Sequence, residues 1–178
     1  MMKKHLILVG FMGTGKTSVG KILAKELNME HLDTDQMIER DRNSSIADIF
    51  SNYGELTFRN IETGVIEQAV QNTHSSVITT GGGIVLRSEN RVCMNRYGFV
   101  FALDAPPEVI IQRLQSDNSR PLLQGGTLKE RVHQLYHVRK PLYQFADYII
   151  QTKNLSETQV ANQIKDIWVK LMKSGEAK

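Results

Sequence analysis

The sequence predicts an α/β fold in which helices cover both faces of a mostly parallel sheet. Three observations support this prediction. Short apolar runs alternate along the chain with longer segments of helical periodicity, a glycine-rich motif directly follows the first apolar run, and the other polar motifs lie at or just after the ends of such runs. Because ligands of such folds bind at the carboxyl ends of the strands, these motifs mark the expected site.

Composition and charge narrow the class of protein. The 178 residues suit one domain with a full hydrophobic core, and a net charge of +3 without a long basic block argues against a nucleic-acid partner. The single cysteine, Cys93, excludes an intramolecular disulfide and a cysteine-based zinc site, and we interpret it as a small buried residue. The first apolar run stops at Gly10, too short for a signal peptide, and no run is long enough to span a membrane. We therefore expect a cytoplasmic protein.

Each element follows from its local pattern. The first strand is expected at 5–9 because HLILV is rich in branched residues and ends at a glycine. Apolar runs with turn residues around them predict further strands at 30–35, 76–80, 97–103 and 147–152. Apolar positions at helical spacing, or prolines that suit a helix start, predict helices at 18–27, 46–50, 56–70, 107–115, 129–143 and 156–172.

The stretch GFMGTGKTS at 10–18 matches a phosphate-binding loop between a strand and a helix. Its glycines Gly10, Gly13 and Gly15 let backbone N–H groups surround phosphate oxygens, and the following helix adds its dipole. Lys16 is expected to reach the outer phosphates, and the Thr17 hydroxyl is placed to ligate Mg²⁺. The alternative is an ordinary glycine turn. The motif predicts binding of a nucleoside triphosphate.

Two carboxylates, Asp33 and Asp35, stand two apart in LDTD at the end of the second predicted strand. In an extended chain they would face the same side, so that one could hold Mg²⁺, directly or through water, and the other could orient a substrate hydroxyl and accept its proton. The alternative is a helix cap, in which Asp35 or Thr34 caps the segment QMIERD.

A triple glycine in TTGGGIV at 79–85 follows the strand predicted at 76–80. Because freezing glycine is entropically costly, the pattern indicates that something must approach the bare backbone. We expect a side chain at Gly82 to take the space of a bound acceptor. The alternative is a flexible bend.

Four arginines are candidate ligands for anions. Arg59 and Glu62 lie three apart on one helix face, either as a clamp for a carboxylate or phosphate or as a surface ion pair of little energy. Arg139 lies near a helix end, where it either binds substrate or interacts with the helix terminus. Arg113 is either structural or faces the nucleotide.

The aperiodic segment 116–127, SDNSRPLLQGGT, reads as a mobile loop that carries Arg120. An arginine brought over a triphosphate can neutralise charge in the transition state, while loop closure excludes water; the alternative is a solvated arginine. The five histidines show no metal-ligand spacing.

Together these motifs resemble those of the shikimate kinase family, from about Leu6 to Ile167. They occur in the family's order as GFMGTGKT, DTD, FRNIE, GGG, RPLL and RKPLY. The resemblance implies the P-loop NTPase fold of the nucleoside monophosphate kinases, with a five-stranded parallel sheet and a mobile lid. It also implies a monomeric enzyme in which 178 residues form a single kinase domain, with a substrate-binding region at about 33–61 and a lid at about 116–127.

The implied reaction moves the γ-phosphate of ATP to the 3-hydroxyl of shikimate, in aromatic amino acid biosynthesis. The resemblance assigns ATP and Mg²⁺ to the residues of the phosphate loop and its surroundings, namely Gly13, Thr14, Gly15, Lys16, Thr17, Ser18, Asp33, Arg113 and Arg120. It assigns shikimate to Asp35, Arg59, Glu62, Gly82, Gly83 and Arg139. Of these, Lys16, Asp35 and Arg120 are the expected catalytic residues. The chain departs from the family near its last strand, where QTKN replaces an adenine-packing arginine and Lys153 or Asn154 is the substitute.

Two other classes remain open at this point. One is another small-molecule kinase of the same fold, acting on gluconate or a nucleotide, and the other is a nucleotide-dependent switch. The paired arginines favour a polyhydroxylated carboxylic acid over a second nucleotide. The sequence lacks the N-K-x-D motif with which many nucleotide switches read the base.

Overall fold

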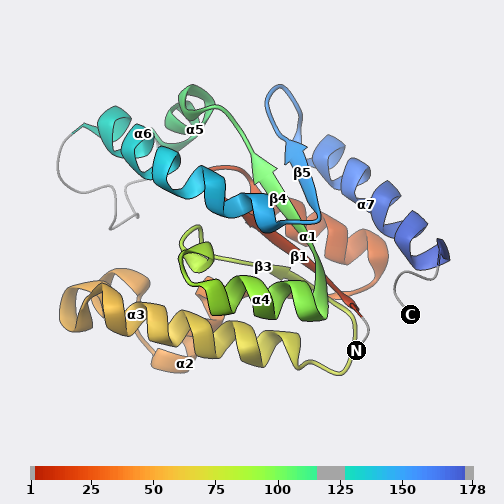
Figure 1. Ribbon diagram of the computed structural model, residues 1–178, viewed down its shortest axis with the longest axis horizontal. Coiled ribbons are helices and arrows are strands. Elements are labelled where there is room, and N and C mark those ends of the chain that lie inside the picture. Colours follow the sequence, from red (N-terminus) through yellow and green to blue (C-terminus); the bar gives the residue numbers. More distant parts are fainter. Residues whose placement is uncertain (1–2, 116–126, 175–178) are drawn as a thin grey trace.

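The computed structural model describes residues 3–115 and 127–174, and these form a five-stranded parallel sheet between two layers of helices (Figure 1). The strands stand in the order β2-β3-β1-β4-β5. Their bounds are β1 His5–Gly10, β2 Glu30–Asp33, β3 Ser76–Thr79, β4 Gly98–Asp104 and β5 Tyr148–Gln151. The α/β class and the five predicted strands are thus confirmed.

Seven α-helices surround the sheet in the described residues. They are α1 Lys16–Leu27, α2 Thr34–Arg42, α3 Ile46–Val70, α4 Ser88–Tyr97, α5 Pro107–Leu114, α6 Leu128–Arg139 and α7 Glu157–Ser174. Helices α1 and α7 pack together on one face, whereas α3, α4 and α6 lie on the other (Figure 1). The central strand β1 supplies both cores, because Leu6 and Leu8 point to one face and Ile7 and Val9 to the other.

The second predicted strand, 30–35, is too long by two residues. Strand β2 ends at Asp33, whose carboxylate caps α2 by accepting hydrogen bonds from the backbone N–H groups of Asp35 and Gln36. A carboxylate here satisfies donors that the first helical turn leaves without partners, so the chain turns into a helix at once. The cap is therefore Asp33 rather than Thr34 or Asp35, and the two aspartates do not share a strand.

Helix boundaries show three further features. Helix α3 joins the two predicted helices across Gly54, whose φ of 78° and ψ of 170° break the helical path. The 129–143 helix turns into a 3₁₀-helix at Lys140–Phe145, since Pro141 has no N–H to donate. Helix α4 was not predicted; it buries Asn90 and Met94 but carries little helical periodicity of apolar residues. Across the described residues we find no helix with the length and apolar character needed to cross a bilayer.

His5 is a buried histidine at the start of β1. Its Nδ1 accepts from the Ser76 N–H at 3.3 Å, so Nε2 carries the proton and donates to the Val70 carbonyl at 3.0 Å. Burial lowers the pKa of His5 below its ordinary value of 6.5. The neutral ring therefore joins β1, β3 and the end of α3.

We predict that the free energies of unfolding of the wild type and of His5→Gln differ less at pH 5.5 than at pH 7.5. A histidine whose pKa is lower in the folded than in the unfolded protein stabilises the fold at pH values above its unfolded-state pKa. This contribution is lost as the pH falls through the folded-state pKa. Urea denaturation at both pH values measures the difference. An equal difference at the two values would contradict a neutral buried His5.

Candidate active site

The phosphate loop lies between β1 and α1 at the carboxyl edge of the sheet (Figure 1). Gly13 and Gly15 have φ angles of 75° and 93°, a backbone region that other residues rarely adopt. Because Gly15 stands at the N-cap of α1 and has no side chain, no side-chain cap closes the helix start. The amino end of α1 is therefore arranged to receive an anion. Lys16 is buried and donates to the Phe11 carbonyl at 2.9 Å.

The Asp33 carboxylate joins the phosphate loop to its neighbours. Its Oδ2 accepts from the hydroxyls of Thr17 at 3.1 Å and Thr79 at 2.8 Å, while its Oδ1 caps α2. His31 Nε2 lies 3.0 Å from the same Thr79 hydroxyl. The Thr79 hydroxyl has one hydrogen, which it donates in the hydrogen bond to Asp33. His31 must therefore be the donor to the Thr79 oxygen, so its Nε2 is protonated. Sequence analysis missed His31 and Thr79, whose role depends on pairing between β2 and β3.

Arg59 is buried at 6% exposure and its partner Glu62 at 1%, which rules out the surface ion pair. The guanidinium donates through Nη1 to Glu62 and through Nε and Nη2 to one oxygen of Glu55. Its carbon also lies 5.2 Å from the centre of the Phe58 ring. Burial raises the pKa of Glu62, and the positive charge of Arg59 opposes that rise. Arg59 is thus held on several sides.

Arg139 enters the same region from the end of α6. It is buried, burial lowers its pKa, and its Nη1 donates to the Gly82 carbonyl at 3.3 Å. The Tyr143 hydroxyl donates to the same carbonyl at 2.7 Å. Tyr143 was not singled out in the sequence. Its burial raises its pKa, which keeps the hydroxyl protonated and able to donate.

The three glycines after β3 face different neighbours. A Cβ at Gly81 would lie 2.6 Å from Asp35 Oδ1, and one at Gly83 would lie 2.7 Å from the Arg59 guanidinium carbon. A Cβ at Gly82 would instead lie 3.1 Å from the Met12 backbone nitrogen. A side chain at Gly82 would therefore press on the phosphate loop, while the tightest contacts would be at Gly81 and Gly83. Gly82 also lines the cavity described next, so the expectation that a side chain there takes the space of an acceptor stays a prediction.

A cavity of about 530 Å³ brings the predicted metal and acceptor residues together. The predicted metal residues that line it are Thr17 and Asp33. The predicted acceptor residues that line it are Asp35, Arg59, Glu62, Gly82, Gly83 and Arg139. A cavity with two buried arginines, several carboxylates and bare backbone can hold a small polar acid next to a phosphate loop.

A second hollow of about 420 Å³ lies on the other side of the loop. It is lined by the predicted nucleotide residues Gly13, Thr14, Gly15 and Arg113, and by Thr152, Leu155 and Glu157 from the segment after β5. Arg113 donates to the carbonyls of Gly13 and Thr152, so it joins the loop to that segment. Neither Lys153 nor Asn154 lines this hollow. Ser18 is exposed in the first turn of α1, and Arg120 lies outside the described residues, as does nearly all of the predicted lid.

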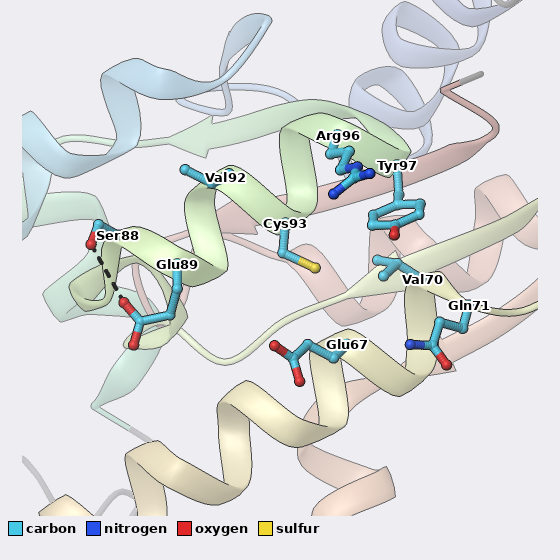
Figure 2. Close-up of a pocket in the computed structure, with 9 residues that line it drawn as sticks. All are labelled: Glu67, Val70, Gln71, Ser88, Glu89, Val92, Cys93, Arg96 and Tyr97. Carbon is cyan, nitrogen blue, oxygen red and sulfur yellow. Dashed lines mark hydrogen bonds between the residues drawn. The ribbon is translucent and has the colours of Figure 1, made fainter. Parts of the chain in front are cut away.

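A third hollow, of about 450 Å³, lies between α3 and α4 and is lined by none of the predicted residues except Cys93 (Figure 2). Cys93 is half-buried there, and burial together with the charge of Glu67 raises the pKa of its thiol. A thiol that stays protonated is a poor nucleophile. Its surroundings agree with a packing role.

Comparisons with known proteins agree on one family. The family model for shikimate kinase matches residues 12–168. Shikimate kinases of Thermodesulfovibrio yellowstonii and Bacillus mycoides are 44% and 42% identical over 161 and 163 residues, which is 90% and 91% of this chain and 92% and 96% of theirs. The solved structure of shikimate kinase from Acinetobacter baumannii in complex with shikimate is 36% identical, with a TM-score of 0.86 over 98% of this chain and 96% of that one. The chain belongs to the shikimate kinase family.

Proposed function

We propose that this chain, an ATP-dependent kinase by family, transfers the γ-phosphate of ATP to the 3-hydroxyl of shikimate and releases ADP and shikimate 3-phosphate. The observation that carries the proposal is the cavity in which buried Arg59 and Arg139 lie with Asp35 beside the phosphate loop. The resemblance to a kinase solved with shikimate supports the choice of acceptor.

On the nucleotide side, residues Gly13 to Ser18 bind the phosphates of ATP, and Lys16 leaves the Phe11 carbonyl to reach the outer ones. Arg113 lies against the nucleotide, and Lys153 is proposed near the adenine from the loop after β5. Arg120 would come from 116–126 to neutralise charge as phosphoryl transfer proceeds. The chain would act as a single monomeric domain in the cytoplasm, with 33–61 binding the acceptor and 116–127 as the lid.

The residues around Thr17 fit a magnesium ion. Thr17 Oγ1 and Asp33 Oδ2 are two oxygens 3.1 Å apart at the mouth of the phosphate loop, and hard oxygen donors suit this ion. In residues 3–115 and 127–174 no cluster of three or more His, Cys, Asp or Glu side chains could hold a metal. Such a sparse protein set matches Mg²⁺, which keeps several waters and binds substrate phosphates. When bound, the ion would neutralise developing charge on the phosphates.

On the acceptor side, Arg59 and Arg139 bind the shikimate carboxylate, and Glu62 holds Arg59 in place by accepting its hydrogen bond. The backbone at Gly82 and Gly83 contacts the ring. Asp35 orients the 3-hydroxyl, which places its carboxylate to take the proton of that hydroxyl. Binding both reactants on rigid elements around one loop supplies the positioning on which phosphoryl transfer depends.

Shikimate should accelerate the release of ADP from MgATP by at least about a hundredfold, the scale of positioning and acid–base effects. A coupled assay measures ADP with shikimate, with gluconate and with neither. Equal rates in all three would favour a nucleotide switch, and stimulation by gluconate alone would favour another small-molecule kinase.

Arg59→Ala and Arg139→Ala should each raise the KM for shikimate by about tenfold to a hundredfold, because each removes a buried charged hydrogen-bond donor worth about 1.5–3 kcal/mol. The affinity for ATP should change little, since neither side chain lines the nucleotide hollow. Steady-state kinetics and ATP titrations measure both. A loss of ATP affinity would contradict the assignment of these arginines to the shikimate carboxylate.

Gly83→Ala should raise the KM for shikimate by about tenfold, because the added methyl group displaces the guanidinium of Arg59. Gly64→Ala in α3 is the matched control, since its added methyl group meets nothing within 4 Å. The control should keep its KM and gain about 0.5–1 kcal/mol of stability. An unchanged KM in a folded Gly83→Ala protein would contradict the role of that glycine.

A further inference from the structure

Arg59 already binds two carboxylates of its own chain. Glu55 Oε1 accepts from Nε at 3.2 Å and from Nη2 at 2.9 Å, and Glu62 accepts from Nη1. A guanidinium has five N–H donors, so these two glutamates use three of them. The whole Nε–Nη2 edge, one of the two edges on which an arginine binds a carboxylate through two parallel bonds, is taken by Glu55.

The positive charge around this arginine is already matched before any substrate is counted. Arg59 and Arg139 supply two positive charges, the two glutamates bound to Arg59 supply two negative ones, and Asp35 is a further carboxylate of the same cavity. A substrate carboxylate between the arginines would add another negative charge to a region where screening is weak. Binding is therefore favoured if one of the two glutamates moves away.

Glu55 is the glutamate that can leave. Its side chain is 53% exposed, whereas that of Glu62 is 1% exposed and enclosed. Glu55 follows Gly54, where α3 departs from helical geometry. Its neighbours Tyr53 and Leu56 are 66% and 74% exposed, so the described residues leave this corner uncovered. Moving a half-exposed carboxylate into water costs little, because water already reaches its side of the ion pair. Such screening holds a surface ion pair to about 1 kcal/mol or less, and this pair is open to water on the Glu55 side.

We propose that Glu55 is an internal competitor for Arg59, which a substrate carboxylate displaces, and that it thereby sets the affinity of this enzyme for its acidic acceptor. This inference rests on the proposed function for the identity of the acceptor. An acid held by several groups of the cavity can displace Glu55, but an acid that offers a carboxylate alone competes poorly. Glu55 thus lowers the affinity of the site for any carboxylate by a similar factor, and this raises the concentration at which simple organic anions, which have no other contacts, can bind.

Arg59 does not depend on Glu55 for its place. The guanidinium carbon lies 5.2 Å and 5.8 Å from the ring centres of Phe58 and Phe50, close to Gly83, and Nη1 is bound by buried Glu62. Removing the charge of Glu55 should therefore leave Arg59 in position and free one of its edges. A residue that only supported Arg59 would give the opposite effect on substrate binding.

Glu55→Gln tests the proposal, with Glu67→Gln as the matched control. Glu67 lies on the same helix and faces the separate hollow between α3 and α4 (Figure 2). For Glu55→Gln we expect the KM for shikimate to fall by about two- to fivefold, the value of a partly exposed ion pair, with the effect on KM and not on kcat. The control should keep the KM of the wild type.

A binding measurement separates this proposal from the proposed function. Cyclohex-1-ene-1-carboxylate presents a ring carboxylate without hydroxyls, and calorimetry gives its Kd for each folded variant without any turnover. We expect Glu55→Gln to bind this probe about two- to fivefold more tightly than do the wild type and Glu67→Gln. If shikimate fails as a substrate but the probe still binds more tightly, only the proposed acceptor is wrong. Unchanged or weaker binding of the probe, no binding to any variant, or a higher shikimate KM in Glu55→Gln would overturn the role of Glu55.

Discussion

The carboxylate of Asp33 is the interaction on which the arrangement of this site depends. It ends β2, caps α2, and accepts hydrogen bonds from the hydroxyls of Thr17 on α1 and Thr79 on β3. Four elements, namely β2, α2, α1 and β3, therefore meet at one side chain at the carboxyl edge of the sheet. Because His31 fixes the hydroxyl of Thr79 in turn, the carboxylate has little freedom to rotate.

Bare backbone is the second constraint, and it explains why charged groups can gather in so small a volume. Gly81 lets the carboxylate of Asp35 approach the backbone that follows β3, and Gly83 lets the guanidinium of Arg59 approach it. Burying the ion pair of Arg59 and Glu62 costs desolvation free energy, so the pair is weak evidence for stability. We interpret it instead as holding a guanidinium in place for an anion. The stability that offsets this cost comes from the two apolar cores on either face of the sheet.

Sequence patterns were sufficient for features that depend on local chemistry. The phosphate loop is recognisable because Lys16 and its glycines stand at fixed spacing between a strand and a helix, and the strands are recognisable as apolar runs. What the patterns missed depends on contacts between distant segments: Tyr143 meets the Gly82 carbonyl across 61 residues, and His31 meets Thr79 across 48. Spacing alone also did not show that a side chain added at Gly82 would press on the phosphate loop, because this depends on how the segment after β3 packs.

The phosphate loop is a shared wall between the two hollows, and this bears on how they communicate. On the nucleotide side Arg113 binds the Gly13 carbonyl, while on the acceptor side the backbone of Gly82 lies close to Met12. The Gly82 carbonyl is bound in turn by Arg139, which lines the 530 Å³ cavity. A shift of the loop on binding phosphates would therefore reach Arg139 through one backbone contact and one hydrogen bond. Coupling between two binding sites needs groups whose positions both ligands affect, and these two contacts are the ones through which the phosphate loop meets the wall of the other cavity.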